Sequence, residues 1–247
     1  MTYVFMAAGA VALVLFCIFR DRKSSTVAIS FKTVASLFFI ATAVSAYLQA
    51  RPLNATPALL MIGGLVMGLV GDITLDFKIF LKGLPYENAE KDADIMTYLG
   101  MACFAVGHVL YITASALRFE MGLTLLWSAI IAVGVVALIF TMSIAVLKMR
   151  FGKFLLASIG YAFLLCWFVV SSIWQTAACA TSGTLLLLFG SVFFIISDLI
   201  LSMTYFSKAE DYQRTGALHP ESKLMIVSNH VTYYVAQYLI ALAILFL

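Results

Sequence analysis

The sequence predicts an all-α fold: a polytopic membrane bundle of eight transmembrane helices forming a single integral membrane domain, residues 1–247. Hydrophobic residues make up 64% of the chain and charged residues 11%, against roughly 25% charged residues in soluble domains. Apolar runs near the ~20 residues that cross about 30 Å of hydrocarbon lie at 2–19, 29–48, 57–76, 95–117, 122–147, 154–174, 182–206 and 224–247. The connections are short apart from 77–94 and 207–223, which leaves no room for a soluble catalytic domain.

The distribution of basic residues predicts the orientation of these runs. No Lys or Arg precedes run 2–19, and basic residues follow it directly, so we expect a retained anchor and not a signal peptide. Loops after the first, third, fifth and seventh runs hold twelve Lys or Arg residues, and loops after the second, fourth and sixth hold two. The positive-inside rule then makes both termini external or lumenal. The twelve are Arg20, Arg22, Lys23, Lys78, Lys82, Lys91, Lys148, Arg150, Lys153, Lys208, Arg214 and Lys223, and the two are Arg51 and Arg118.

The net charge of +3 is therefore a topology signal. It is too small and too dispersed to indicate nucleic-acid binding. A lipid bilayer is the expected environment: the endoplasmic reticulum membrane in a eukaryote, or the inner membrane in a bacterium.

Two carboxylates interrupt the apolar runs. Asp72 and Asp198 each lie about fifteen residues into a run, where an ionisable group costs at least a few kcal/mol and is by default functional. Their offset of 126 aligns residues 1–121 with 122–247. Four helices per half give both halves the same orientation, which predicts a parallel repeat. The matching depths predict one shared site.

Other polar residues fall at similar depths, on the predicted cytoplasmic side. Lys32 lies a few residues inside the second run, and the last run brings polar residues to the same zone. In the fourth run, His108 and Tyr111 share a helix face because they are three residues apart. We expect the aspartates and Lys32 to line a pocket in the cytoplasmic half. The last run would contribute Asn229, His230, Tyr233, Tyr234 and Gln237 to it.

Structural interpretations remain open for each of these residues. The aspartates could simply pair with Lys32 to fix helix packing, or the Lys32 ammonium could reach the interface. Asp76, one turn after Asp72, is interpreted as an interfacial residue. Two carboxylates nevertheless exceed one cation. Burial and a like-charged neighbour both disfavour ionisation, so we expect the surplus acid to be partly protonated and able to act as a general acid.

No motif indicates a metal or a cofactor. The three histidines are scattered and form no His-Glu-x-x-His arrangement, and a carboxylate pair alone makes a poor zinc site. No phosphate-binding glycine loop or Gly-x-Ser-x-Gly elbow is present. We therefore predict neither a metal nor a cofactor.

Five segments together resemble the YhhN-like lysoplasmalogenase family. They are FKTVASLFFIA, GLVMGLVGDITLDF, GMACFAVGHVLYI, GSVFFIISDLILS and VTYYVAQYLIALA, in this order on the second, third, fourth, seventh and eighth runs. No single motif would suffice, but the series covers most of the bundle. The chain departs from the family where Thr33 follows Lys32, since the family often has proline there, and in a longer 207–223 loop.

The resemblance implies an eight-span hydrolase that cleaves the vinyl ether bond of lysoplasmalogens. The products would be a fatty aldehyde and glycerophosphoethanolamine or glycerophosphocholine, with a lysophospholipid and water as the only partners in the reaction. The family's catalytic aspartates match Asp72 and Asp198. Its other motif residues match Lys32, His108, Tyr111, Thr232, Tyr233, Tyr234 and Gln237.

The chemistry of the bond makes this plausible. A vinyl ether resists bases and nucleophiles, but protonation of its β-carbon gives an oxocarbenium ion that water captures. One aspartic acid would donate that proton while the other, ionised, stabilises the cation and orients water, as paired carboxylates do for glycosides. The sequence leaves open which is which. Lys32 would keep one carboxylate ionised or bind the lipid phosphate, and His108, Asn229, Tyr233, Tyr234 and Gln237 would supply hydrogen bonds.

Two other classes compete with this interpretation. A proton-coupled transporter also uses acids inside the membrane and repeated halves, but it would need interrupted helices, and neither aspartate run contains a proline beyond its first residue. An intramembrane aspartyl protease is suggested by GLVGD, yet the glycines are misplaced by one residue and no Pro-Ala-Leu motif follows.

Overall fold

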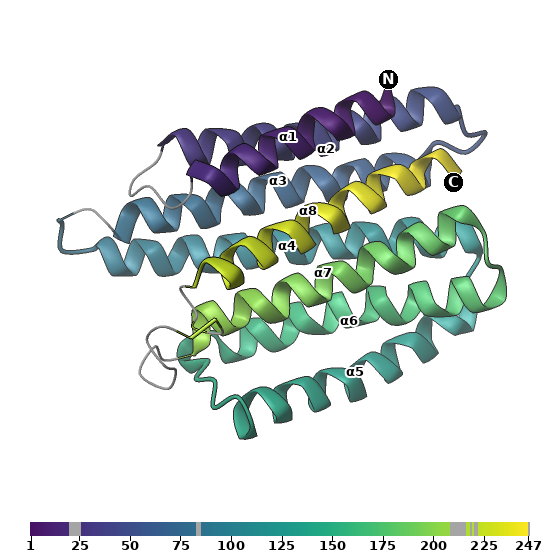
Figure 1. Ribbon diagram of the computed structural model, residues 1–247. Coiled ribbons are helices and arrows are strands. Elements are labelled where there is room, and N and C mark those ends of the chain that lie inside the picture. The colour runs from purple at the N-terminus through teal and green to yellow at the C-terminus, as the bar shows by residue number, and fades with distance from the viewer. Residues whose placement is uncertain (20–25, 83–84, 208–215, 218, 220–221, 247) are drawn as a thin grey trace.

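The computed structural model describes residues 1–19, 26–82, 85–207, 216–217, 219 and 222–246 (Figure 1). Eight helices in this part of the chain are long and apolar enough to cross a membrane, which confirms the predicted fold class. The helices are α1 (Thr2–Phe19), α2 (Thr26–Ala50), α3 (Thr56–Lys82), α4 (Ala89–Phe119), α5 (Gly122–Ala145), α6 (Leu155–Ala178), α7 (Ser182–Phe206) and α8 (Lys223–Ala243), with 3-10 turns η1 (Gly152–Phe154) and η3 (Ile244–Phe246).

The predicted connection 77–94 is shorter than expected. Helix α3 continues to Lys82 and α4 begins at Ala89, so most of this charged segment is helical. Hydropathy marks only the part of a helix that lies in lipid, and a helix can continue into water beyond it. Glu90 and Asp92 in the first turn of α4 also favour helix formation there, because negative charge is stabilising near a helix N-terminus.

Both termini lie at one end of the bundle, together with the connections after α2, α4 and α6 (Figure 1). The connections after α3 and α5 lie at the opposite end. This is the arrangement that the sequence predicts, and the assignment of the second end to the cytoplasm stays a prediction. Five of the basic residues behind that assignment, and the side chain of a sixth, lie outside the described residues: Arg20, Arg22, Lys23, Lys208 and Arg214, and the side chain of Lys82.

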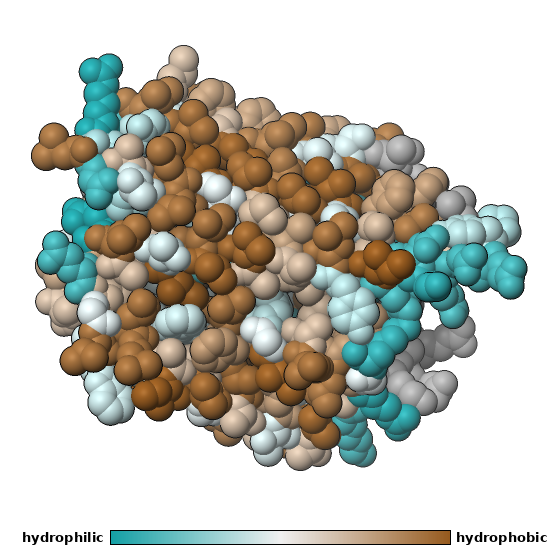
Figure 2. All heavy atoms as spheres, turned by 180° about the vertical axis from the view of Figure 1, so that it is seen from behind, coloured by the Kyte–Doolittle hydropathy of each residue, from teal (hydrophilic) through white to brown (hydrophobic). Residues whose placement is uncertain are grey.

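On the face shown in Figure 2, a hydrophobic belt covers the middle of the molecule, with hydrophilic residues gathered at its two ends. Helix α5 contributes strongly to the belt: Leu123, Trp127 and Leu138 are at least half exposed, and its buried residues are few. Large exposed apolar surfaces of this kind match a lipid environment, where outward-facing side chains need not be polar. The protein is a multi-pass membrane protein.

The helices pack as consecutive pairs, α1 with α2, α3 with α4, α5 with α6, and α7 with α8. Further contacts of α2 with α8 and of α4 with α6 join the two halves. If each helix of α1–α4 corresponds to the helix four places later, α2 corresponds to α6 and α4 to α8. The contact of α2 with α8 then corresponds to the contact of α6 with α4, as a parallel repeat would require. The repeat itself stays a prediction.

Glycines let each helix that carries an aspartate pack closely against the helix that follows it. A Cβ atom on Gly64 of α3 would lie 2.3 Å from the ring of Tyr111 on α4, and one on Gly190 of α7 would lie 2.9 Å from Ile240 on α8. Small residues at helix interfaces let membrane helices pack closely. Gly64 and Gly190 are themselves 126 positions apart, so each half closes its aspartate helix against the next helix in a similar way.

Candidate active site

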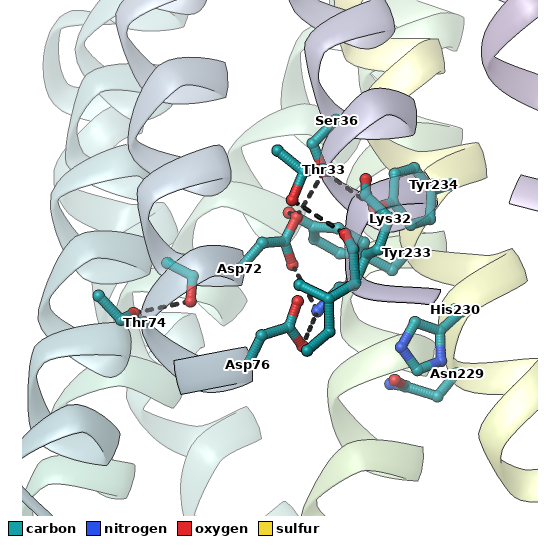
Figure 3. A network of polar contacts seen from close by, with 12 residues as sticks. Lys32, Thr33, Ser36, Asp72, Thr74, Asp76, Asn229, His230, Tyr233 and Tyr234 are labelled. Atoms are coloured by element: carbon teal, nitrogen blue, oxygen red, sulfur yellow. Dashed lines mark hydrogen bonds and ion pairs between the residues drawn. The ribbon is translucent and has the colours of Figure 1, made fainter. Parts of the chain in front are cut away.

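Lys32 of α2 lies between two carboxyl groups of α3 (Figure 3). Its Nζ is 2.9 Å from Oδ1 of Asp76 and 3.5 Å from Oδ1 of Asp72. The Lys32 side chain is only 8% exposed, so its ammonium does not reach outward to the interface. The structure corrects the interpretation of Asp76 as interfacial, because its side chain is 14% exposed and holds the closer contact with Lys32. We call Lys32, Asp72 and Asp76 the Lys32 cluster.

Hydroxyl groups from two helices complete the surroundings of Asp72. Ser36 of α2 and Tyr233 of α8 both hydrogen-bond to Oδ2 of Asp72, at 2.9 Å and 3.0 Å. The Tyr234 hydroxyl lies 2.8 Å from the Ser36 hydroxyl and donates to the carbonyl of Lys32 at 2.9 Å. Helices α2, α3 and α8 therefore meet at one carboxyl group.

The polar contacts continue from Tyr233 into the bundle. Gln237 donates from Nε2 to the Tyr233 hydroxyl at 2.9 Å, and its Oε1 accepts a hydrogen bond of 3.1 Å from Tyr111 of α4. Both Gln237 and Tyr111 are almost completely buried. Tyr111, Tyr233, Tyr234 and Gln237, four of the predicted binding residues, thus belong to the same network as Asp72 and Lys32.

Asp198 of α7 has different surroundings. The hydroxyl of Tyr161 on α6 donates to Oδ2 of Asp198, and no ion pair to Asp198 is found among the described residues. Its carboxyl group lies on the wall of a cavity of about 120 Å³ between α3, α4, α5, α6 and α7. The wall is predominantly apolar and includes Leu75, Met101, Phe140, Leu165 and Ile195. We call this space the Asp198 cavity.

The two catalytic candidates therefore belong to separate networks. No hydrogen bond or ion pair between the described residues joins the two carboxyl groups. A layer of aromatic rings lies between their partners: Phe104 is 6.0 Å from the ring of Tyr233 and 6.5 Å from that of Tyr161. The expectation of one site shared directly by Asp72, Asp198 and Lys32 differs from this arrangement, because equal depth does not bring two helices together laterally.

His108 lies within the aromatic layer. Its ring centroid is 4.7 Å from that of Phe194 and 5.7 Å from that of Tyr161. Nδ1 is 2.8 Å from the carbonyl oxygen of Phe104, and since a carbonyl only accepts, Nδ1 carries a hydrogen and Nε2 offers a lone pair in the neutral ring. Nε2 is buried and has no hydrogen-bond partner in the described part of the chain.

Asn229 is set apart from the Asp72 network (Figure 3). Its amide donates to the carbonyl of Ser197 at 2.8 Å and to the Ser197 hydroxyl at 3.1 Å, which ties α8 to α7. His230 packs against the ring of Phe16 on α1 at 4.6 Å. The structure thus brings Asn229 next to the residue that precedes Asp198, and does not bring it to Lys32.

Comparison with known proteins identifies the family. The model of the YhhN family matches residues 27–244, a range that begins in α2 and ends after α8 and contains both aspartate networks. The chain belongs to the YhhN family. No curated protein and no solved structure matches this YhhN protein.

Several polar residues of the YhhN protein's two networks were missed by the sequence analysis. Ser36 follows Lys32 by four residues, so helical spacing alone placed this pair on one face. Tyr161 and Ser158 of α6 line the Asp198 cavity, and their spacing of three is the corresponding signal. No group of three or more His, Cys, Asp or Glu side chains suited to a metal occurs among the described residues.

Proposed function

We propose that this YhhN protein is a lysoplasmalogenase, an ether hydrolase of lipid metabolism. It would cleave the vinyl ether bond of alkenyl-glycerophosphoethanolamine or alkenyl-glycerophosphocholine, giving a fatty aldehyde and the glycerophospho alcohol. The observation that carries the proposal is the Asp198 carboxyl group on the wall of an apolar cavity inside the membrane bundle. Membership of the YhhN family is consistent with this activity.

Asp198 is the proposed proton donor. A carboxylic acid must hold its proton to protonate carbon, and no ion pair that would favour the ionised form of Asp198 is found among the described residues. The hydroxyl of Tyr161 fixes the orientation of the carboxyl group toward one position. An alkenyl chain in the cavity would bring its vinyl carbon close to the acid. The surroundings hold little water, so proton transfer to carbon competes better there with proton transfer to water.

Asp72 is the proposed source of negative charge. The Lys32 cluster holds one ammonium group for two carboxyl groups. One carboxyl group is therefore in excess, and it lies across the aromatic layer from Asp198. Negative charge in a medium of low dielectric constant stabilises a developing cation over several ångströms. Because Lys32 already pairs with Asp76, we assign it to the charge balance of Asp72 and not to the lipid phosphate.

The remaining candidate residues orient Asp72 or Asp198, or continue the hydrogen-bond network around them. Tyr233 bonds Asp72 directly, while Gln237 and Tyr111 support Tyr233 through hydrogen bonds. His108 would present Nε2 as an acceptor within the aromatic layer. Asn229, bonded to Ser197, would act on the position of Asp198 through α7 and not on the headgroup.

Proton-coupled transport of a small molecule or lipid is the alternative function. A series of polar contacts runs from Tyr111 through Gln237, Tyr233 and Asp72 to Lys32, as a proton pathway would. Both aspartate helices are nevertheless uninterrupted, from Thr56 to Lys82 and from Ser182 to Phe206. Transporter sites are typically built on broken helices, so we prefer hydrolysis.

The test uses the purified protein in lipid nanodiscs. Lysoplasmenylethanolamine, lysoplasmenylcholine and the saturated ether analogue are supplied separately, and released aldehyde is quantified by mass spectrometry. We expect aldehyde from at least one vinyl ether and none from the saturated ether. Absence of aldehyde from both vinyl ethers, with transport of a lysolipid in proteoliposomes, would replace hydrolysis by the alternative.

A further inference from the structure

One buried polar atom in the wall of the Asp198 cavity is left without a partner. Ser158 of α6 is 7% exposed and is among the residues that line the cavity. Its Oγ is buried and makes no hydrogen bond to any residue that the structure describes. Native proteins rarely leave a buried hydroxyl unsatisfied, and such a group commonly marks a place for water or a ligand.

Ser158 faces the same space as the proposed acid. Ser158 and Tyr161 are three residues apart on α6, which places them on one helix face, and Tyr161 donates to Asp198. Two other hydroxyl groups of the wall bond to their own helices: Ser202 donates to the carbonyl of Leu199 at 2.8 Å, and Thr97 donates to that of Ala93 at 2.9 Å. Ser158 therefore offers a buried hydroxyl, without a partner among the described residues, to the cavity that Asp198 also lines.

We propose that Ser158 positions the attacking water for Asp198. This assignment rests on the proposed function. The cavity of about 120 Å³ exceeds the ~30 Å³ that one water molecule occupies in the liquid, so it has room for a water molecule and the reacting end of an alkenyl chain. The Ser158 hydroxyl would accept one hydrogen of that water while the other points to Asp198.

The reaction balances with these groups alone. Asp198 gives its proton to the β-carbon of the vinyl ether, and the oxocarbenium ion forms at the carbon that carries oxygen. The water oxygen then bonds to this carbon, and the water proton passes to the Asp198 carboxylate. The hemiacetal finally breaks its bond to the glycerol oxygen, which takes the hydroxyl proton, and leaves the fatty aldehyde.

Methanol provides a readout that a purely structural serine would not change. Methanol captures the same oxocarbenium ion, but it gives a mixed acetal and not an aldehyde. Because methanol has only one O–H hydrogen, it cannot bond both Ser158 and the Asp198 carboxylate as water does. The wild-type protein should therefore favour water over methanol in the capture of the oxocarbenium ion. The ratio of acetal to aldehyde measures that preference.

The experiment compares Ser158→Ala, Ser158→Thr and Ser172→Ala in water with added methanol. Ser158→Ala should lower aldehyde release about tenfold and raise the ratio of acetal to aldehyde several-fold. Ser158→Thr keeps the hydroxyl and should keep the wild-type ratio. Ser172→Ala should keep it too, because Ser172 lies on the same helix outside the cavity lining and its hydroxyl bonds the carbonyl of Phe168. Thermal unfolding in nanodiscs confirms that each variant is folded.

The outcomes separate the two proposals. An active wild-type protein whose acetal ratio is unchanged in folded Ser158→Ala overturns the assignment of Ser158 and leaves the hydrolase intact. If Ser158→Ala does not fold, a changed ratio in Ser158→Thr or in Ser172→Ala overturns it as well. A wild-type protein that releases no aldehyde from any lysoplasmalogen overturns the proposed function and the Ser158 assignment together.

Discussion

The two intramembrane aspartates occupy equivalent places in their helices and have opposite surroundings. Asp72 lies beside an ammonium group, a second carboxyl group and two hydroxyl groups. Asp198 has the Tyr161 hydroxyl as its partner and an apolar cavity in front of it. Depth in the membrane makes both residues costly, but their partners determine what each can do. We propose that the pair divides its work between a charged site and a neutral one.

The same offset that relates the aspartates relates their neighbours. Adding 126 to Lys32 gives Ser158, and adding 126 to Asp76 gives Ser202. The charged residues of the Lys32 cluster thus correspond to two serines in the wall of the Asp198 cavity. A duplicated half-site that lost its charges would produce this difference, and the loss would leave the second acid without a counter-ion.

Replacing the acids should have the largest effect on activity. Asp198→Asn removes the proposed proton donor, and general acids contribute about 10²–10⁴-fold to a rate, so aldehyde release should fall by that factor. Asp72→Asn should also abolish detectable release by removing negative charge, while Lys32 keeps Asp76 and the protein still folds. Aldehyde release is measured with the purified variants, and gel filtration serves as the check on each preparation. Release at the wild-type rate by either variant would contradict the division of work.

Removing the cation of the Lys32 cluster should have the largest effect on stability. Lys32→Met leaves two buried carboxyl groups with no ammonium, and breaking a buried ion pair in this way typically costs about 3–5 kcal/mol. The double variant Lys32→Met/Asp76→Asn removes both members of the closer pair and should regain most of that loss. Unfolding in mixed micelles compares the three proteins. A double variant no more stable than the single one would show that Asp76 is not the main counter-ion.

The smaller effects come from single hydrogen bonds. Tyr161→Phe keeps the ring and removes the hydroxyl that orients Asp198. One such bond is worth about 1 kcal/mol, so kcat/KM for aldehyde release should fall by up to about tenfold, with a small decrease in the unfolding midpoint from the same lost bond. An unchanged kcat/KM would mean that Asp198 needs no orientation by Tyr161.

The smallest effect is expected at the surface and serves as the control for the acid variants. Asp94 of α4 pairs with Lys153, whose side chain is 60% exposed. Exposed ion pairs contribute about 0–1 kcal/mol, so Asp94→Asn should leave both aldehyde release and the unfolding midpoint within error. A large loss of activity in this variant would show that loss of any aspartate, and not of the buried acids in particular, impairs the protein.

The sequence predicted the helices well because hydropathy and length decide which segments can cross a bilayer. It also placed Lys32, Tyr233, Tyr234 and Gln237 of the Asp72 network in one pocket, because their predicted depths are similar to that of the aspartate. The separation of Asp198 from Asp72 could not be predicted, because depth along a helix carries no information about its lateral neighbours. Asn229 shows the same limit: its partner Ser197 belongs to a helix that the spacing of α8 alone does not identify.

Ser158 and Tyr161 were missed for a different reason. In an apolar helix a serine or tyrosine is usually a packing residue, and only the cavity and the partner carboxyl group distinguish these two. Asp76 was misinterpreted because one helical turn separates it from Asp72 and places it near the predicted membrane surface. The long, flexible side chain of Lys32 turned toward Asp76, which made Asp76 part of the buried cluster.

Solvent deuterium tests the central claim most directly, because acid attack on the vinyl carbon must leave a solvent hydrogen there. Lysoplasmenylethanolamine is hydrolysed by the wild-type protein in D₂O, and the aldehyde is analysed at once by mass spectrometry. We predict one deuterium on the carbon next to the aldehyde carbon, and loss of this labelled product in Asp198→Asn. Aldehyde without deuterium at that carbon, or labelled product at the wild-type rate from Asp198→Asn, would contradict proton donation by Asp198.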